Sequence, residues 1–268
     1  MAEQRLIPKT GSKVSLKNYD PADTGGYDKK RARAEEQELE TRLATLQEML
    51  YAQGTQALLV VLQAMDAGGK DSTIKKVFNS VNPQGVYVTS FKAPTAEELG
   101  HDFLWRIHAN TPRRGYIGIF NRSHYEDVLV VRVNNLVPRA MWEKRYDQIN
   151  EFEHLLYESG TRILKFYLHI SKDEQKQRLQ ERLDRPEKWW KFAIEDLPVR
   201  EQWDQYMEAY EVALTRCNTA YAPWHIVPAN HKWYRDVVIT RAIVETLEDM
   251  KVAYPQPKQD LSGVKIPD

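Results

Sequence analysis

The hydrophobic positions of this chain alternate between short continuous runs and longer runs with helical spacing. Continuous apolar runs of strand length fall at residues 57–64, 86–91, 116–120, 162–170 and 225–229. Apolar residues that recur every three or four positions predict helices at 28–53, 71–81, 95–110, 138–159, 172–183, 199–217 and 233–252. Buried strands that alternate with amphipathic helices are typical of a parallel sheet covered on both faces.

The pattern is weaker at both ends of the chain. Residues 1–27 are polar and interrupted by proline and glycine, which predicts an extended arm. Residues 255–268 have the composition of a C-terminal tail that lies on the surface. We therefore expect a single domain over 28–254, and 268 residues are enough to give it a proper core.

The first strand runs into a glycine-rich turn that opens a helix, in the order LQAMDAGGKDST over residues 62–73. Gly68 and Gly69 can turn their N–H groups inward, and a helix N-terminus adds partial positive charge. Lys70 adds a full charge. This arrangement predicts a phosphate-binding loop that includes Ala67, Asp71 and Ser72; the alternative is a turn whose glycines serve geometry alone.

The loop departs from the ordinary P-loop pattern. Ala64 stands where the first glycine is expected, and Asp71 follows the lysine where serine or threonine is usual. Asp66 lies inside the loop, where a carboxylate would repel bound phosphates unless a metal ion or a donor intervenes. An inward Asp66 therefore predicts Mg²⁺, with Mn²⁺ as a substitute.

A second polar cluster, FNRSHYED over residues 120–127, follows the strand at 116–120. Ligands of parallel sheets bind at the carboxyl ends of strands, so Arg122 is expected to bind phosphate. Glu126 and Asp127 offer oxygen ligands to Mg²⁺, with one expected to face the site and the other a helix or solvent. His124 is better explained as a structural residue of the loop.

A third cluster is basic and aromatic and predicts a lid at about 176–198. Arg178 and Arg182 lie one helical turn apart, so both can face neighbouring phosphates. Residues 176–191 contain six basic and three acidic side chains, among them Lys188 and Lys191, whereas a solvated charged helix is the alternative. The aromatic pair at 189–190 is expected to anchor the lid rather than to stack on a base.

Further basic residues are expected to be ordinary surface charges individually, although together they could line the approach to the crevice. They are Lys75, Lys76, Lys92, Arg106, Arg113 and Arg114.

Composition narrows the class of function. The chain has 38 basic and 38 acidic residues, so binding of a polyanion has to depend on local clusters, and nucleic acid is disfavoured as the main partner. One cysteine excludes an intramolecular disulfide and a multi-cysteine zinc site, and it suits a reducing compartment. No apolar run approaches membrane-spanning length, and we expect a cytoplasmic protein without a membrane partner.

Four segments together resemble the family-2 polyphosphate kinases, over about residues 30–255. They are LQAMDAGGKDSTI at 62–74, FNRSHYEDV at 120–128, RLDRPEKWWK at 182–191 and APWHIVPANHKWY at 222–234. The chain is most similar to the single-domain class III members. That resemblance implies a three-layer α/β/α P-loop kinase-like domain with a parallel sheet and a helical lid. It also implies polyphosphate and purine nucleotides as substrates, and a homo-oligomer, either a dimer or a tetramer.

The resemblance also implies roles for individual residues. Those with catalytic roles are Asp66, Lys70, Arg122 and Arg178; those that bind polyphosphate are Ala67, Gly68, Gly69, Lys70, Asp71, Ser72, Lys75, Arg122, Arg178, Arg182, Lys188 and Lys191. Nucleotide contacts are expected from Asp66, Asn121, Arg122 and Glu126. Many members carry aspartate at the position of Asn121, so the second metal-linked carboxylate is expected to be Glu126 or Asp127.

The expected reaction is Mg²⁺-dependent, reversible transfer of the terminal phosphoryl group of polyphosphate to ADP, GDP or AMP. An ATP-dependent nucleoside monophosphate kinase of the thymidylate kinase type is the main alternative. A non-catalytic nucleotide-sensing or nucleic-acid-binding module is a second alternative, against which the neutral net charge argues.

Overall fold

The structure is a computed structural model that describes residues 6–267 of the chain. Its centre is a fully parallel five-stranded sheet with strand order β2-β3-β1-β4-β5. The strands are β1 (Ala57–Gln63), β2 (Val86–Ser90), β3 (Ile117–Asn121), β4 (Thr161–His169) and β5 (Trp224–Pro228). Each strand begins and ends within one residue of the predicted limits. All seven residues of the central strand β1 are buried, as expected for a strand covered on both faces.

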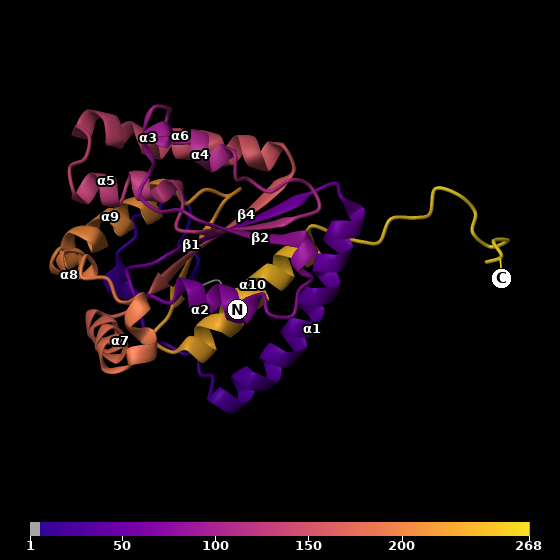
Figure 1. Cartoon of the computed structure of the whole chain (residues 1–268), viewed down its shortest axis with the longest axis horizontal. Helices are drawn as coiled ribbons and strands as arrows, with labels where there is room; N and C mark the ends of the chain where they lie inside the picture. The colour runs from indigo at the N-terminus through magenta and orange to yellow at the C-terminus, as the bar shows by residue number, and fades with distance from the viewer. Residues whose placement is uncertain (1–5, 268) are drawn as a thin grey trace.

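Helices cover both faces of this sheet, which gives the predicted three-layer architecture (Figure 1). The helices are α1 (Lys29–Gln53), α2 (Lys70–Val77), α3 (Ala96–Leu99), α4 (Trp105–His108), α5 (Val130–Val133), α6 (Arg139–Glu158), α7 (Lys172–Asp184), α8 (Asp196–Glu201), α9 (Trp203–Arg216) and α10 (Lys232–Asp249). In Figure 1, α1, α2 and α10 lie below the sheet, and α6 with the short helices α3, α4 and α5 lies above it.

Local capping explains where the first long helix begins and ends. The carboxylate of Asp28 accepts a hydrogen bond from the N–H of Arg31 at 2.7 Å, and Gly54 ends the helix in the left-handed conformation with φ +63°. The predicted helix 28–53 is confirmed.

Two predicted helices are each divided in the structure. The segment 95–110 contains α3 and α4 rather than one helix, because Thr95 and Glu98 form a capping box and α3 already ends at Gly100. Asp102 then accepts a hydrogen bond from the N–H of Leu104 at 2.9 Å, and this local turn starts the next short helix. The segment 199–217 is also divided, with α8 and α9 separated at residue 202.

The two ends of the chain differ in how they contact the domain. Val14 and Leu16 are buried, and the N–H of Val14 donates to Thr215 Oγ1 at 2.9 Å. Residues 255–267 are exposed and extend away from the body of the molecule in Figure 1. Within residues 6–267, no helix is both long and apolar enough to cross a membrane.

Candidate active site

The turn between β1 and α2 has the close backbone packing of an anion-binding loop. Ala67 has φ +57° and Gly69 has φ +105°, so two residues of the loop are in the left-handed region. A Cβ atom at Gly68 would lie 2.5 Å from Cβ of Ala64 and 2.7 Å from the carbonyl oxygen of Met65. Ala64 therefore fits where a P-loop usually has glycine because residue 68 has no side chain.

Lys70 is the first residue of α2 and is buried at the base of the loop. Its ammonium group donates to the carbonyl oxygen of Ala64 at 2.9 Å. Burial lowers the pKa of Lys70, and the charge of Arg122 lowers it further, while Asp66, Glu126 and Asp71 act in the opposite direction. These charges reach Lys70 from two segments of the chain, residues 62–73 and 120–127, so the two segments converge on one place.

Asp66 and Arg122 form an ion pair across the ends of β1 and β3. Arg122 Nη2 lies 2.7 Å from Asp66 Oδ1, and the two side chains are 39% and 17% exposed. Burial lowers the pKa of Arg122, but the carboxylates of Glu126 and Asp66 outweigh it and the pKa is raised. The two residues predicted to meet at the site are therefore in direct contact. Asn121 is near as well, since its amide donates to Asp71 Oδ1 at 2.6 Å.

The structure separates Glu126 from Asp127. Burial raises the pKa of Glu126 above its ordinary value, although the charges of Arg122 and Lys70 act to lower it. Glu126 is therefore close enough to the loop cluster to interact with its charges. Asp127 instead bonds Arg145 Nη1 at 2.8 Å, and burial raises its pKa to about 6. Of the two candidate metal ligands, only Glu126 shares the surroundings of Asp66.

The predicted lid consists of α7, a 3₁₀ turn η5 (Pro186–Lys191) and α8. Arg178 is buried and donates to backbone carbonyls, and burial lowers its pKa. Arg182 donates to the carbonyl oxygen of Lys191 at 2.8 Å, and Lys188 lies 2.6 Å from Glu181 Oε1. The lid cations thus hold the lid together in this conformation.

The two lid tryptophans differ in environment. Trp189 is 59% exposed, and its Nε1–H donates to the carbonyl oxygen of Leu183 at 2.8 Å, so its contact within the lid is a single hydrogen bond rather than a buried ring. Trp190 is 79% exposed and lines the cavity beside the loop, so the anchoring role predicted for it is wrong. Lys191 lies over its ring at 4.8 Å from the centroid.

The loop, the end of β3 and the lid enclose one cavity of about 490 Å³. Its charged lining residues are Asp66, Lys70, Asp71, Lys92, Arg122, Arg178, Glu181, Arg182, Lys188, Lys191, Asp196 and Lys232; its loop residues include Ala67, Gly68, Gly69 and Ser72. Lys75 does not line this cavity. It follows Lys70 by five residues, or about 140° around the helix axis, and is exposed on the outer face of α2.

Sequence reasoning missed two charged residues of this cavity. Lys232 begins α10 four residues after the end of β5, so its position beyond a strand end was available as a signal, and burial lowers its pKa. Asp196 begins α8 and lies 3.6 Å from Arg182. No sequence pattern distinguished Asp196 from the other acidic residues of the lid.

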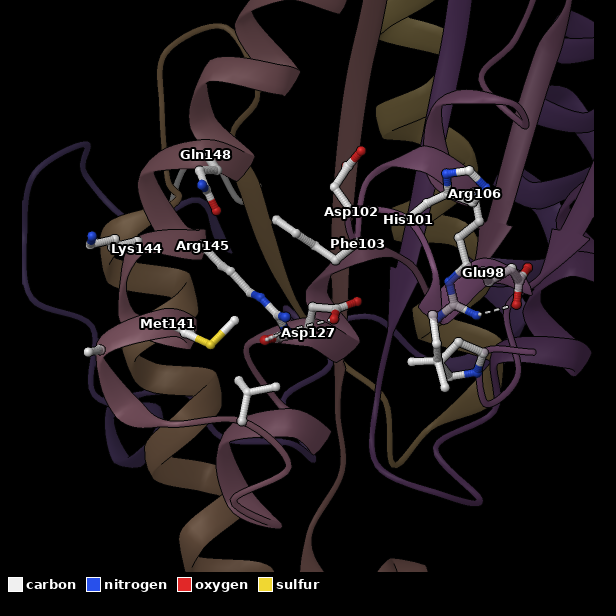
Figure 2. A pocket seen from close by; sticks show the side chains of 14 residues that line it. Glu98, His101, Asp102, Phe103, Arg106, Asp127, Met141, Lys144, Arg145 and Gln148 are labelled. Atoms are coloured by element: carbon white, nitrogen blue, oxygen red, sulfur yellow. Dashed lines mark hydrogen bonds and ion pairs between the residues drawn. The ribbon is translucent and has the colours of Figure 1, made fainter. Parts of the chain in front are cut away.

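A second cavity of about 510 Å³ lies on the other side of the strand-end cluster, between α3, α4 and α6 (Figure 2). Phe103 and Met141 contribute apolar walls, and Arg145 points at Asp127 within it. Arg106, expected to be a surface charge, is buried here and donates to the carbonyl oxygen of Lys92 at 2.8 Å. That expectation was wrong, because the short helix α4 turns this side chain inward.

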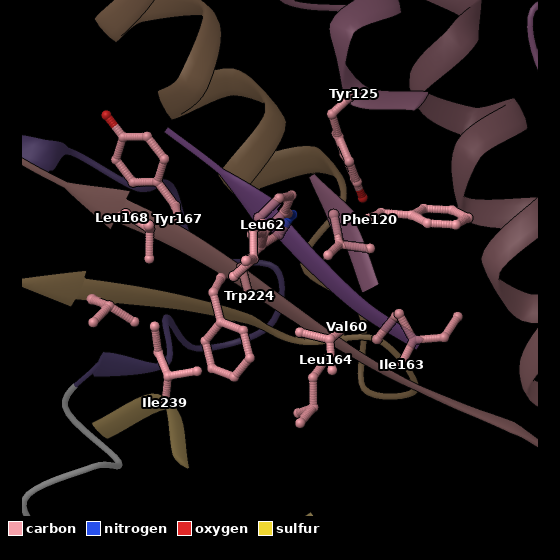
Figure 3. Packing of buried hydrophobic residues seen from close by; sticks show 14 of the residues in the cluster. Val60, Leu62, Phe120, Tyr125, Ile163, Leu164, Tyr167, Leu168, Trp224 and Ile239 are labelled. Atoms are coloured by element: carbon pink, nitrogen blue, oxygen red, sulfur yellow. The ribbon is translucent and has the colours of Figure 1, made fainter. Parts of the chain in front are cut away.

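A buried ionic network lies next to the strand-end cluster, between β4 and α6. Lys165 of β4 and Glu153 of α6 are both 0% exposed and their charged atoms are 2.5 Å apart. Tyr125 donates to Glu153 at 2.8 Å, and its ring packs edge-on against Trp224 (Figure 3). His124 is fully buried and 3.1 Å from Glu153, so it is structural, as predicted.

Comparison with known proteins identifies the family. The profile of "Polyphosphate kinase 2 (PPK2)" matches residues 26–255, most of the chain. This chain belongs to the polyphosphate kinase 2 family. An "AMP/ADP-polyphosphate phosphotransferase" from Meiothermus ruber is 57% identical over 260 residues, which are 96% of this chain and 97% of that protein. An "ADP-polyphosphate phosphotransferase" from Rhodopseudomonas palustris is 48% identical over 80% of this chain and 78% of its own length.

Solved structures of polyphosphate kinase 2 proteins share the fold. The polyphosphate kinase 2 from Arthrobacter aurescens TC1 has a TM-score of 0.93 and 44% identity over 97% of this chain and 94% of its own. A protein described as a putative polyphosphate kinase 2, from Pseudomonas aeruginosa PA01, has a TM-score of 0.81 and 35% identity over 85% of this chain and 49% of its own. The predicted P-loop kinase-like fold class is confirmed.

Phosphotransfer in the polyphosphate kinase 2 family implies a divalent cation, and the carboxylates at the loop suit one. Within residues 6–267, no group of three or more acidic, histidine or cysteine side chains is arranged to hold a metal by itself. Mg²⁺ is commonly bound through one or two carboxylates and substrate phosphates. Asp66 lines the cavity and suits that role, and Glu126, whose pKa the charge of Asp66 helps to raise, is the second candidate, whereas Asp127 is engaged in the second cavity.

Proposed function

We propose that this protein transfers the terminal phosphoryl group of inorganic polyphosphate to nucleoside diphosphates such as ADP and GDP, and to nucleoside monophosphates such as AMP. The observation that carries the proposal is the cavity in which Asp66, Lys70 and Arg122 meet beneath the basic lid. The names of relatives that match nearly the full length of the chain support the same reaction.

The charge of the cavity suits a polyanionic donor. Eight basic side chains and four acidic ones line it, although the whole chain is neutral. Most of the basic residues come from the lid and from the segments around it, whereas Lys70 and Arg122 lie at the ends of the central strands. Polyphosphate can therefore extend from the loop along the lid, with its terminal group near Lys70.

The second cavity suits the nucleoside part of the acceptor. It combines apolar walls with a few charged groups, which is the usual composition of a small-molecule pocket. The segment 121–127 separates the two cavities, since Arg122 lines the first and Asp127 the second. A nucleotide whose base and ribose occupy the second cavity would present its terminal phosphate toward Arg122.

Catalysis in this arrangement consists of positioning and charge neutralisation. Two anions have to meet, so Lys70, Arg122 and the lid cations would offset their repulsion and align the acceptor oxygen with the donor phosphorus. Asp66 and Glu126 would hold Mg²⁺, which supplies further charge neutralisation when bound. Closure of the lid excludes water, which would otherwise accept the phosphoryl group. Both donor and product are phosphoanhydrides, so the reaction is expected to be reversible.

The donor is tested by incubating the protein with ADP, Mg²⁺ and polyphosphate in the absence of ATP. New ATP, and ADP formed from AMP in a parallel reaction, are the expected results. An ATP-dependent monophosphate kinase would phosphorylate AMP only when ATP is added. A nucleotide-sensing module would form no product in either reaction, and both outcomes would reject the proposal.

The acceptor cavity is tested by filling it. Met141→Trp places a larger side chain in the cavity, so KM for ADP is expected to rise by about tenfold with KM for polyphosphate unchanged. Leu155→Trp is the matched control because Leu155 is exposed on the same helix and does not line the cavity. Equal KM values for ADP in both variants would show that the nucleoside does not bind in the second cavity.

A further inference from the structure

Four consecutive carbonyl groups of the phosphate loop are held by buried side chains from outside the loop. Gln175 Nε2 donates to the carbonyl oxygen of Asp66 at 3.0 Å. Arg178 Nη1 donates to those of Ala67 and Gly68 at 3.1 and 3.0 Å. Arg235 Nη1, on α10, donates to that of Gly69 at 3.4 Å.

Arg178 is the centre of this arrangement. Its Nη2 donates to the carbonyl oxygens of Ala229 and Asn230 at 2.6 and 3.3 Å, and its Nε donates to Glu174 at 2.7 Å. A guanidinium group has five N–H donors in a fixed plane, and here five acceptors surround it. The side chain is 7% exposed and joins the loop, the segment after β5 and helix α7.

The positions of these carbonyl groups determine where the loop N–H groups point. In a planar trans peptide the C=O and the following N–H point in opposite directions. When Arg178 holds the carbonyl oxygen of Gly68, the N–H of Gly69 is fixed in direction as well, whereas the N–H of Gly68 already donates to the carbonyl oxygen of Met65 at 2.9 Å within the turn. A loop amide fixed in this way is ready for an anion before the anion arrives.

We propose that Arg178 is a positioning residue that pre-forms the phosphate loop, with Gln175 and Arg235 completing the support. This differs from the role expected from the sequence, in which Arg178 clamps the transferred phosphate. It also means that α7 stays attached to the loop, and that lid movement is confined to residues after Asp184. The activity arm of the test below depends on the proposed function, whereas the exchange arm does not.

The proposal predicts a change in the loop before any substrate binds. Hydrogen–deuterium exchange is measured on the substrate-free protein for the peptide covering residues 65–72, in the wild type, Arg178→Ala and Arg178→Lys. Both variants are expected to exchange at least about tenfold faster in this peptide, because several hydrogen bonds from a charged donor are lost. A peptide from β4 serves as the internal reference, and exchange there is expected to be unchanged.

Turnover provides the second measurement. Both variants are expected to lose about a hundredfold in kcat, and added guanidinium is expected to restore part of the activity of Arg178→Ala. Lysine keeps the charge but cannot span three segments, so Arg178→Lys separates positioning from charge alone. Arg185→Ala is the matched control, because Arg185 is 53% exposed and pairs only with Glu181 among the described residues.

Two results would overturn the proposal. Loss of activity with unchanged exchange of the loop peptide would mean that Arg178 acts on the phosphate directly. Near-normal turnover in Arg178→Lys would mean that positive charge, and not the planar group, is what the site requires.

Discussion

The buried pair beneath the strand-end cluster gives a sharp stability prediction. In Lys165→Met, Glu153 loses a charged partner 2.5 Å away and stays 0% exposed, with only Tyr125 and His124 as neighbouring donors. An uncompensated buried charge costs about 3–5 kcal/mol. For a chain of 268 residues this corresponds to a decrease in Tm of about 6–20 °C.

The assay is urea denaturation at neutral pH, with the free energy of unfolding compared among three variants. Lys165→Met/Glu153→Gln removes both charges and is expected to be more stable than Lys165→Met alone. Arg139→Met is the control, because Arg139 is 77% exposed in its pair with Glu143 on the same helix as Glu153. A loss below about 1 kcal/mol in Lys165→Met, or no recovery in the double variant, would refute the reasoning.

The same pair has a pH signature. Burial raises the pKa of Glu153, but Lys165 and His124 outweigh it, and the pKa lies below its ordinary value of 4.5. A lowered carboxyl pKa stabilises the fold above the pKa of the unfolded chain, and the contribution is lost as pH falls through the folded value. In Lys165→Met the pKa of Glu153 loses the lowering effect of Lys165 and is raised by burial, so Glu153 binds a proton at a higher pH than in the wild type. The difference in stability between wild type and Lys165→Met is therefore expected to shrink as the pH falls through the acidic range.

Three further predictions concern the two cavities. Lys70→Ala and Asp66→Asn are each expected to reduce kcat by about a hundredfold or more with the circular dichroism spectrum unchanged, and retained turnover would exclude the loop from the mechanism. Gly68→Ala introduces a Cβ 2.5 Å from that of Ala64 and is expected to lower kcat by about a hundredfold; a normal rate would show that the loop adapts. The pKa of Asp127 is raised to about 6, so its folded form binds the extra proton and loses stability as pH rises through that value. The free energy of unfolding of Asp127→Asn, relative to that of the wild type, is accordingly expected to rise by about 2–3 kcal/mol between about pH 4 and pH 8. Parallel pH profiles of the two proteins would contradict this.

The strands were predictable because each is a continuous apolar run bounded by polar turns. The helix pattern was less informative where capping overrides periodicity. The capping box of Thr95 starts α3, and the N–H of Gly100 bonds the carbonyl oxygen of Glu97 and ends it after one turn. The division between α8 and α9 likewise has no signal in the spacing of apolar residues.

The site was predictable in its charges more than in its geometry. The contact between Asp66 and Arg122 follows from the rule that ligands bind at strand ends. The rule fails for Asp127, which follows the same strand but pairs with Arg145 in the second cavity. Neighbours in sequence at the end of a strand can face opposite sides of a turn. The burial of Arg178 against loop carbonyls depends on packing between α7 and β5, which no local pattern encodes.

Direct transfer from polyphosphate to the nucleotide is the central claim, and tracing the phosphoryl group tests it most directly. The protein is mixed in a single turnover with terminally radiolabelled polyphosphate, Mg²⁺ and unlabelled ADP, and the products are separated. The account predicts label in the terminal phosphate of ATP, none covalently bound to the protein, and no transfer in Lys70→Ala. Label that first accumulates on the protein, or ATP that stays unlabelled, would contradict it.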